Sequence, residues 1–172
     1  MNITLIGMAG VGKSTIGKAL AKRLSCTFID VDSLIKEKTC MSLQALIDTR
    51  GDSALVRLEE EAVLSLDLRG DSIISPGGSV VYSEKAMNFL KEKSTIIFLD
   101  TSFRNIVRRI RNPAKRGLVG FKERSLRELF EERLVLYRKY ADMTVKVKGH
   151  ERVPVVVEKI LEGLESLPDS RC

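Results

Sequence analysis

A segment of eight residues near the N-terminus has the composition and spacing of a phosphate-binding loop. Its glycines allow the backbone to wrap around a phosphate with several N–H groups pointing inward, at the positive N-terminus of the following helix. Lys13 can reach the β- and γ-phosphates, and the Ser14 hydroxyl can ligate Mg²⁺. The alternative is a plain glycine turn between a strand and a helix. The pattern G-x-x-x-x-G-K-[ST], which favours a nucleoside triphosphate site, is matched in full by Gly7-Met8-Ala9-Gly10-Val11-Gly12-Lys13-Ser14.

Two carboxylates follow a second strand pattern, at Asp30 and Asp32. Residues at positions i and i+2 of a strand share one face, so both carboxylates are expected on the same side. One could hold Mg²⁺ through water, and the other could accept the proton of a substrate hydroxyl. Alternatively, Asp32 caps the next helix with its side chain. The pair gains functional weight only from the nearby phosphate-binding loop.

The segments that must position these residues alternate between strand and helix patterns. This alternation indicates an α/β domain with a parallel sheet covered by helices on both faces. In such sheets the ligand binds beyond the carboxyl ends of the strands. The predicted strands are Asn2–Ile6, Thr27–Val31, Ser72–Ser75, Thr95–Leu99 and Met143–Val147. The predicted helices are Lys13–Leu24, Ser33–Lys38, Leu43–Asp48, Asp52–Leu68 (with Leu55, Leu58, Ala62 and Leu66 on one face), Ser83–Lys91, Phe103–Ile110, Ser125–Tyr140 (with a capping box at Ser125 and Glu128) and Val153–Leu164.

Length and composition indicate one globular domain over residues 1–172. The chain is 44% hydrophobic and 30% charged, and it contains neither a repeat nor a linker, which excludes disordered and low-complexity classes. The net charge of +6 suits an anionic ligand, either a small phosphorylated molecule or nucleic acid. Three widely spaced cysteines and one histidine argue against a zinc site and for a reducing compartment. Without a membrane-length apolar run or a signal-peptide pattern, we expect a cytoplasmic protein.

These residues resemble the shikimate kinases, a family of small P-loop kinases, over nearly the whole chain. GMAGVGKST resembles the family's phosphate loop, and FIDVD resembles its F-x-D-x-D strand end. The segment 76–79, PGGS, falls where the family has a triple-glycine turn against the substrate. The segment 116–119, RGLV, falls where it has R-P-L-L in a lid, and ERLVLY at 132–137 resembles E-R-x-x-x-Y. The resemblance implies a five-stranded parallel sheet in the order 2-3-1-4-5. It also implies Mg-dependent phosphoryl transfer from ATP to a hydroxyl, with conversion of shikimate to shikimate 3-phosphate as the first candidate.

The resemblance also implies a role for each matching residue. Lys13 and Arg116 would neutralise the charge that develops on the transferred phosphoryl group. Arg109 would pack on the adenine, and Arg133 would grip the substrate carboxylate. A mobile, basic lid at about residues 112–123 would close and exclude water. The expected residues are, for nucleotide binding, Gly7, Gly10, Val11, Gly12, Lys13, Ser14, Thr15, Arg109 and Arg116; for the metal, Ser14 and Asp30; for the acceptor, Asp32, Arg57, Gly77, Gly78, Ser79 and Arg133; and for catalysis, Lys13, Asp32 as the base and Arg116.

Two departures from the family pattern concern the acceptor site. The pattern G-E-x-x-F-R-x-x-E aligns without a gap from Gly51 and puts Val56 at the position of the substrate-binding arginine. A one-residue shift uses Arg57 instead, about 100° further round the helix. Ser79 replaces the third glycine, which adds a hydroxyl and restricts the backbone. The sequence leaves both alignments open, and loss of one arginine would weaken substrate binding by roughly 2–3 kcal/mol.

Other functions stay open on the sequence alone. Val56 and Ser79 are compatible with a related kinase that phosphorylates a different hydroxyl acceptor. A nucleotide-binding protein without kinase activity is a second alternative, although the retained base and lid speak against it. A nucleic-acid binder is suggested only by the pI near 9.3, and the chain lacks an aromatic platform or a recognisable module. We expect a small-molecule acceptor, neither nucleic acid nor membrane as partner, and a monomer, since no heptad or large apolar stripe occurs.

Overall fold

The computed structural model describes residues 1–110, 112–113 and 116–167. Two residues of the predicted lid, at 114 and 115, and Cys172 lie outside this part of the chain. None of the helices in the described part is both long and apolar enough to cross a membrane. The strands are β1 (Asn2–Ile6), β2 (Thr27–Asp30), β3 (Ser72–Ser75), β4 (Thr95–Asp100) and β5 (Met143–Lys146). The helices are α1 (Lys13–Leu24), α2 (Val31–Thr39), α3 (Leu43–Arg50), α4 (Asp52–Leu64), the 3₁₀ helix η1 (Val80–Tyr82), α5 (Glu84–Lys93), α6 (Phe103–Arg109), α7 (Leu126–Tyr140) and α8 (Val153–Glu165).

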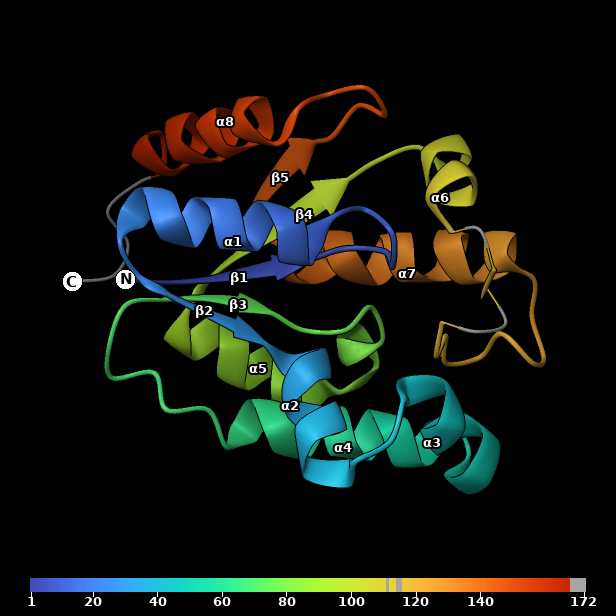
Figure 1. Ribbon diagram of the computed structural model, residues 1–172. Helices are drawn as coiled ribbons and strands as arrows, with labels where there is room; N and C mark the ends of the chain where they lie inside the picture. The colour runs from blue at the N-terminus through green and yellow to red at the C-terminus, as the bar shows by residue number, and fades with distance from the viewer. Residues whose placement is uncertain (111, 114–115, 168–172) are drawn as a thin grey trace.

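The five strands form one parallel sheet in the order β2-β3-β1-β4-β5, which confirms the predicted fold. Ile3 of β1 lies opposite Ile73 of β3, and Leu5 lies opposite Ile97 of β4. Helices α1 and α8 lie side by side along one face, and α5 and α7 pack from the other (Figure 1). Because helices cover both faces, apolar side chains of both alternating sets are buried in the central strands, such as Ile96 and Ile97 of β4.

The carboxyl ends of the strands meet at one edge of the sheet, and the predicted motifs gather there. Strand β1 leads into the phosphate-binding loop and α1, and β2 leads directly into α2. Strand β3 leads into the turn at residues 76–79 and then η1. Residues 116–125, which precede α7, lie beyond the same edge (Figure 1). The topology therefore brings together residues that are far apart in the sequence.

The second strand ends earlier than its sequence pattern predicts. Strand β2 stops at Asp30, whose side chain caps α2 by accepting a hydrogen bond from the Ser33 N–H at 3.3 Å. Asp32 therefore lies in the first turn of α2 and does not share a strand face with Asp30. Asp30, rather than Asp32, makes the cap, because its extended backbone turns the chain into the helix.

The buried face of helix α4 shares only Leu55 with the apolar face that the sequence predicts. The helix ends at Leu64, and its buried residues are Leu55, Glu59 and Val63, each four positions apart. Apolar residues occur around much of this helix, so their spacing alone did not identify the buried face. The residues of the predicted face other than Leu55 are only partly buried: Leu58, Ala62 and Leu66.

Candidate active site

A cavity of about 660 Å³ lies at the carboxyl edge of the sheet. The phosphate-binding loop, the start of α2, α4, the turn after β3, residues 116–118 and α7 all contribute to its wall. The structure thus brings most of the predicted site residues into one space. Those that line it are Gly10, Gly12, Lys13, Ser14, Thr15, Asp30, Asp32, Gly77, Gly78, Ser79, Arg109, Arg116 and Arg133.

The phosphate-binding loop has backbone conformations that require glycine. Gly7 and Gly12 have φ angles of 148° and 107°. The Lys13 Nζ donates a hydrogen bond to the Gly7 carbonyl at 2.8 Å. Gly7 itself does not line the cavity, so it stabilises the loop through this contact. Burial lowers the pKa of Lys13 to about 8, although the negative charges of Asp32 and Glu59 oppose this shift. A phosphate that binds in the loop can replace the Gly7 carbonyl as the hydrogen-bond acceptor of the Lys13 amine.

Arg109 fastens the loop from α6. Its Nη1 donates hydrogen bonds to the carbonyls of Val11 at 2.7 Å and Gly10 at 3.4 Å. Val11 is buried, and its N–H donates to the Met8 carbonyl at 3.1 Å. Val11 therefore stabilises the conformation of the loop through contacts in the interior. Arg109 lines the cavity beside the loop.

Ser14 and Asp30 form a pair of oxygen donors next to the loop. The Ser14 Oγ donates a hydrogen bond to Asp30 Oδ2 at 2.9 Å. A hydroxyl and a carboxylate suit Mg²⁺, which binds few protein oxygens and takes its other ligands from phosphates and water. Within the described residues, no group of three or more His, Cys, Asp or Glu side chains could hold a metal ion. Because two oxygen donors leave most ligand positions to other groups, the pair fits a Mg²⁺ that arrives with phosphates.

Two carboxylates from different helices converge on the turn after β3. A Cβ added to Gly77 would lie 2.5 Å from Glu59 Oε1 and 2.8 Å from Asp32 Oδ1. Burial raises the pKa of Asp32, and the negative charge of Asp30 adds to the rise against the opposing effect of Lys13. Glycine at position 77 leaves the room that these two carboxylates occupy beside the turn. A carboxylate such as Asp32, close to the phosphate-binding loop, can accept a proton from a substrate hydroxyl.

Glu59 belongs to the site, although the sequence analysis did not propose it. Its side chain is 2% exposed, lines the cavity, and accepts a hydrogen bond from the Ser79 hydroxyl at 2.6 Å. Burial raises the pKa of Glu59 to about 7, and the negative charge of Asp32 adds to the rise. A signal was available in the sequence, because Glu59 interrupts the apolar spacing that links Leu55 to Val63. A carboxylate at such a position is forced into the interior, which is often functional.

Arg133 is held rigidly in the wall formed by α7. It is 1% exposed, and it donates hydrogen bonds from Nε to the Tyr82 hydroxyl at 3.2 Å and from Nη2 to the Val119 carbonyl at 2.8 Å. The Tyr137 hydroxyl donates to the Gly78 carbonyl at 2.6 Å, which ties α7 to the turn after β3. A fixed guanidinium of this kind suits a planar anion such as a carboxylate.

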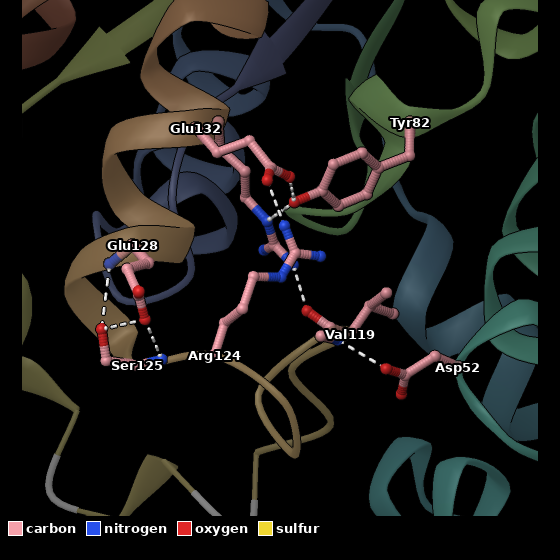
Figure 2. A network of polar contacts seen from close by, with 9 residues as sticks. Asp52, Tyr82, Val119, Arg124, Ser125, Glu128 and Glu132 are labelled. Atoms are coloured by element: carbon pink, nitrogen blue, oxygen red, sulfur yellow. Dashed lines mark hydrogen bonds and ion pairs between the residues drawn. The ribbon is translucent and has the colours of Figure 1, made fainter.

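The segment after the cavity wall, residues 119–124, is anchored to α4 and α7. The Gly120 N–H donates a hydrogen bond to Asp52 Oδ2 at 2.6 Å. Arg124 forms an ion pair with Glu132, and Glu132 also accepts a hydrogen bond from the Tyr82 hydroxyl at 2.6 Å. Figure 2 shows these contacts, with Tyr82 and Glu132 above the segment and Asp52 beside Val119. The same tyrosine thus contacts both this network and Arg133.

Comparison with known proteins finds similarity along nearly the full chain. A shikimate kinase from Aquifex aeolicus (strain VF5) is 34% identical over 165 residues, which cover 96% of each chain. A shikimate kinase from Paracidovorax citrulli (strain AAC00-1) is 36% identical over 169 residues, covering 96% of this chain and 92% of the relative. A solved structure, shikimate kinase from Acinetobacter baumannii in complex with shikimate, has a TM-score of 0.88 at 28% identity and covers 96% of this chain and 93% of its own. The shikimate kinase family model matches residues 9–165.

The chain belongs to the shikimate kinase family. It is therefore a small-molecule kinase that phosphorylates a hydroxyl group.

Helix α4 departs from the shikimate kinase pattern at the arginine position. Arg57 is exposed and does not line the cavity, so the prediction that it binds the acceptor is wrong. At 100° per residue, Arg57 lies about 160° from Glu59 around the helix, whereas Val56 lies only about 60° away. The ungapped alignment is therefore the one that the helix geometry supports. Val56 is half-buried against the core and carries no charge into the site.

Proposed function

We propose that this kinase transfers the γ-phosphoryl group of ATP to the 3-hydroxyl of shikimate, with Mg²⁺ as the required ion. The observation that carries the proposal is the position of Asp32. Its Oδ1 faces Gly77 inside the cavity that also contains the phosphate-binding loop and Arg133. A hydroxyl between the loop and Asp32 would be in line for phosphorylation, and the A. baumannii relative is described in complex with shikimate.

In the proposed step, the acceptor hydroxyl oxygen attacks the γ-phosphorus and forms a new P–O bond. The bond from the γ-phosphorus to the β,γ-bridging oxygen breaks, and ADP leaves with the electron pair. Asp32 takes the hydroxyl proton. Lys13 and Arg116 neutralise the charge that develops on the phosphoryl oxygens, because phosphoryl transfer depends mainly on positioning and charge stabilisation. Both side chains line the cavity beside the loop.

Ser14 and Asp30 would hold Mg²⁺, since their oxygens form the donor pair described above. When bound, the ion would supply positive charge that stabilises the phosphate oxygens. Gly10, Gly12 and Thr15 would contact the phosphates. Arg109, which already braces the loop carbonyls, would lie against the adenine.

The acceptor would be held by Arg133 and by the turn after β3. The Arg133 guanidinium would bind the shikimate carboxylate, while Gly77, Gly78 and Ser79 would form the surface under the ring. Residues 112–123 would act as a lid that excludes water during transfer. Because one cavity of this chain is lined by both the phosphate-binding loop and Arg133, we further propose that the enzyme acts as a cytoplasmic monomer on a small molecule, rather than on nucleic acid or a membrane.

The test is ADP release from Mg·ATP, measured by a coupled assay with and without millimolar shikimate. We expect shikimate-dependent release that disappears when Mg²⁺ is chelated. Protein that binds ATP but releases no additional ADP with shikimate would overturn the assignment of the acceptor. Phosphorylation of another hydroxyl compound in the same assay would then favour the related kinase, for which Val56 and Ser79 are the specific observations.

A further inference from the structure

The part of the cavity wall that carries Arg116 is a short stretch of backbone at residues 116–118. Burial is the main cause of the shifted pKa values of Lys13 and Asp32, and the charge of Arg116 contributes to both. The Arg116 side chain is nevertheless exposed, and among the described residues no ion pair includes it. The position of this guanidinium therefore depends on what holds the backbone beside it.

The backbone beside Arg116 is held by helix α3. The Gly117 N–H donates a hydrogen bond to Gln44 Oε1 at 3.0 Å, and Gln44 is a half-buried residue that lines the cavity. Gly117 has a φ angle of 65°, and a Cβ added to it would lie 2.5 Å from the Cβ of Leu43. Glycine satisfies both conditions, the left-handed backbone and the close approach. The segment therefore lies directly against the start of α3.

The amide of Gln44 is fixed by a second contact. Its Nε2 donates a hydrogen bond to Asp48 Oδ1 at 3.1 Å, one helical turn further along α3. Asp48 also pairs with Lys122 at 3.0 Å, so the same carboxylate binds the segment again beyond Gly117. An amide side chain has one acceptor end and one donor end. Because Asp48 takes the donor end, the oxygen of Gln44 is directed to Gly117.

The contact between Gln44 and Gly117 depends on a departure from the family pattern. Residues 116–119 are RGLV, where the resemblance gives R-P-L-L, so Gly117 occupies the place of the proline. A proline has no backbone N–H, and its ring fixes φ near −65°. It could therefore neither donate to Gln44 nor adopt the backbone conformation of Gly117. The hydrogen bond is a property of this chain's own glycine.

We propose that Gln44 is a positioning residue for phosphoryl transfer, which holds Arg116 at the transferred phosphoryl group by binding the Gly117 N–H. The inference rests on the proposed function, and it gives helix α3 a part in the reaction. Gln44 acts through Arg116, whose charge is needed most where charge develops in the transition state. Loss of the Gln44 contact should therefore lower kcat and leave the binding of both substrates nearly unchanged.

The experiment is a double-mutant cycle on Gln44 and Arg116. Gln44→Met keeps the length and the apolar part of the side chain but removes the acceptor oxygen, whereas Gln44→Glu keeps an acceptor oxygen. Both are made in wild type and in Arg116→Ala. Arg50→Met is the control, because Arg50 is an exposed residue of the same helix and does not line the cavity. Coupled ADP release gives kcat and both KM values, NMR gives the exchange rate of the Gly117 amide, and thermal melting checks folding.

We expect Gln44→Met to lower kcat by roughly 3- to 10-fold, which corresponds to one neutral hydrogen bond. The KM values for shikimate and ATP should stay within about twofold of wild type, and the Gly117 amide should exchange faster. Gln44→Glu should keep kcat within about twofold, because it can still accept the bond. In the Arg116→Ala background, Gln44→Met should change kcat by less than about twofold, since the residue that it positions is absent. Arg50→Met should behave as wild type.

Three results would overturn the inference while the proposed function stands. The first is folded Gln44→Met protein with the wild-type kcat. The second is an equally large loss of kcat in the Arg116→Ala background, which would show that Gln44 acts without this arginine. The third is a raised KM for shikimate with unchanged kcat, which would make Gln44 a direct contact of the acceptor. Wild-type protein without shikimate-dependent ADP release would instead overturn the proposed function and, with it, the role of Gln44 in transfer.

Discussion

The guanidinium of Arg133 donates a hydrogen bond from Nη2 to the main-chain carbonyl of Val119 at 2.8 Å. This bond connects the proposed acceptor-binding arginine to the segment that follows the cavity wall at residues 116–118. An acceptor carboxylate must therefore share the guanidinium with Val119 or displace its carbonyl. Position of the segment and occupancy of the acceptor site are thus physically coupled.

Arg133→Lys should reduce acceptor binding much more than nucleotide binding. A lysine keeps the charge but cannot form the planar fork that contacts Tyr82, Val119 and a carboxylate together. We expect KM for shikimate to increase by roughly 100-fold, and KM for ATP by less than about threefold. Steady-state kinetics with each substrate varied in turn checks this. Arg138→Lys, an exposed change on the same helix, is the control, and equal effects on both KM values would contradict the assignment.

Asp30→Asn should make the enzyme demand more Mg²⁺. The amide oxygen can still cap α2, but it lacks the charge that would hold the ion with Ser14. We expect kcat at low Mg²⁺ to fall by roughly 10- to 100-fold and to recover in part as Mg²⁺ is raised. Titration of activity with Mg²⁺ at fixed ATP measures the shift. Asp67→Asn, an exposed change outside the cavity, serves as the control. An unchanged Mg²⁺ requirement would remove Asp30 from the metal site.

Gly77→Ala should block the acceptor site by steric contact. The new Cβ would meet Glu59 Oε1 at 2.5 Å and Asp32 Oδ1 at 2.8 Å. We expect a loss of kcat/KM for shikimate of more than about 100-fold, because a misplaced base and a filled pocket both act on the same step. Nucleotide affinity, measured by calorimetry with ADP, should stay within about threefold of the wild-type value. Gly70→Ala is the control, since its Cβ would meet nothing within 4 Å.

Glu59 should make folding stability depend on pH. Its pKa is about 7 in the folded protein and 4.5 when unperturbed, so between these values the folded state keeps a proton that the unfolded chain releases. The contribution of Glu59 is therefore fully present below about pH 4.5 and is lost as pH rises through about 7. The charged groups around it are Asp32 on α2, Lys13 on α1 and Arg133 on α7, together with the Ser79 and Tyr137 hydroxyls.

Urea denaturation of wild type and Glu59→Gln at pH 5.0 and 7.5 (about the limits of this range) measures the effect. The glutamine does not titrate, so its stability relative to wild type should increase by up to about 3 kcal/mol as pH rises. Glu60→Gln should keep the wild-type pH dependence, because Glu60 is bonded to Ser83 outside the cavity. Parallel pH profiles for wild type and Glu59→Gln would show that Glu59 titrates normally.

The sequence by itself determined the parts of the molecule whose interactions are local. The phosphate-binding loop was readable because its backbone donors, Lys13 and Ser14 are contiguous, and the loop needs only a strand before it and a helix after it. The capping box of α7 was predicted and is present, because Ser125 and Glu128 bond each other within one turn. The order of the strands followed from resemblance to a family, since alternation of strands and helices alone indicates a parallel sheet but no order.

Only the tertiary structure shows which residues line the proposed acceptor site. Arg57 and Val56 are one position apart, and the sequence permits either at the site; the packing of α4 against α2, α3 and α5 turns Arg57 to solvent and Glu59 into the cavity. Neighbouring residues of a helix point about 100° apart, so the sequence cannot show which of the two faces the cavity until the orientation of the helix is known. The meeting of Glu59 with Ser79 and Asp32 joins three separate elements. Such a contact depends on which faces the core buries, and burial is a property of the whole fold rather than of any one segment.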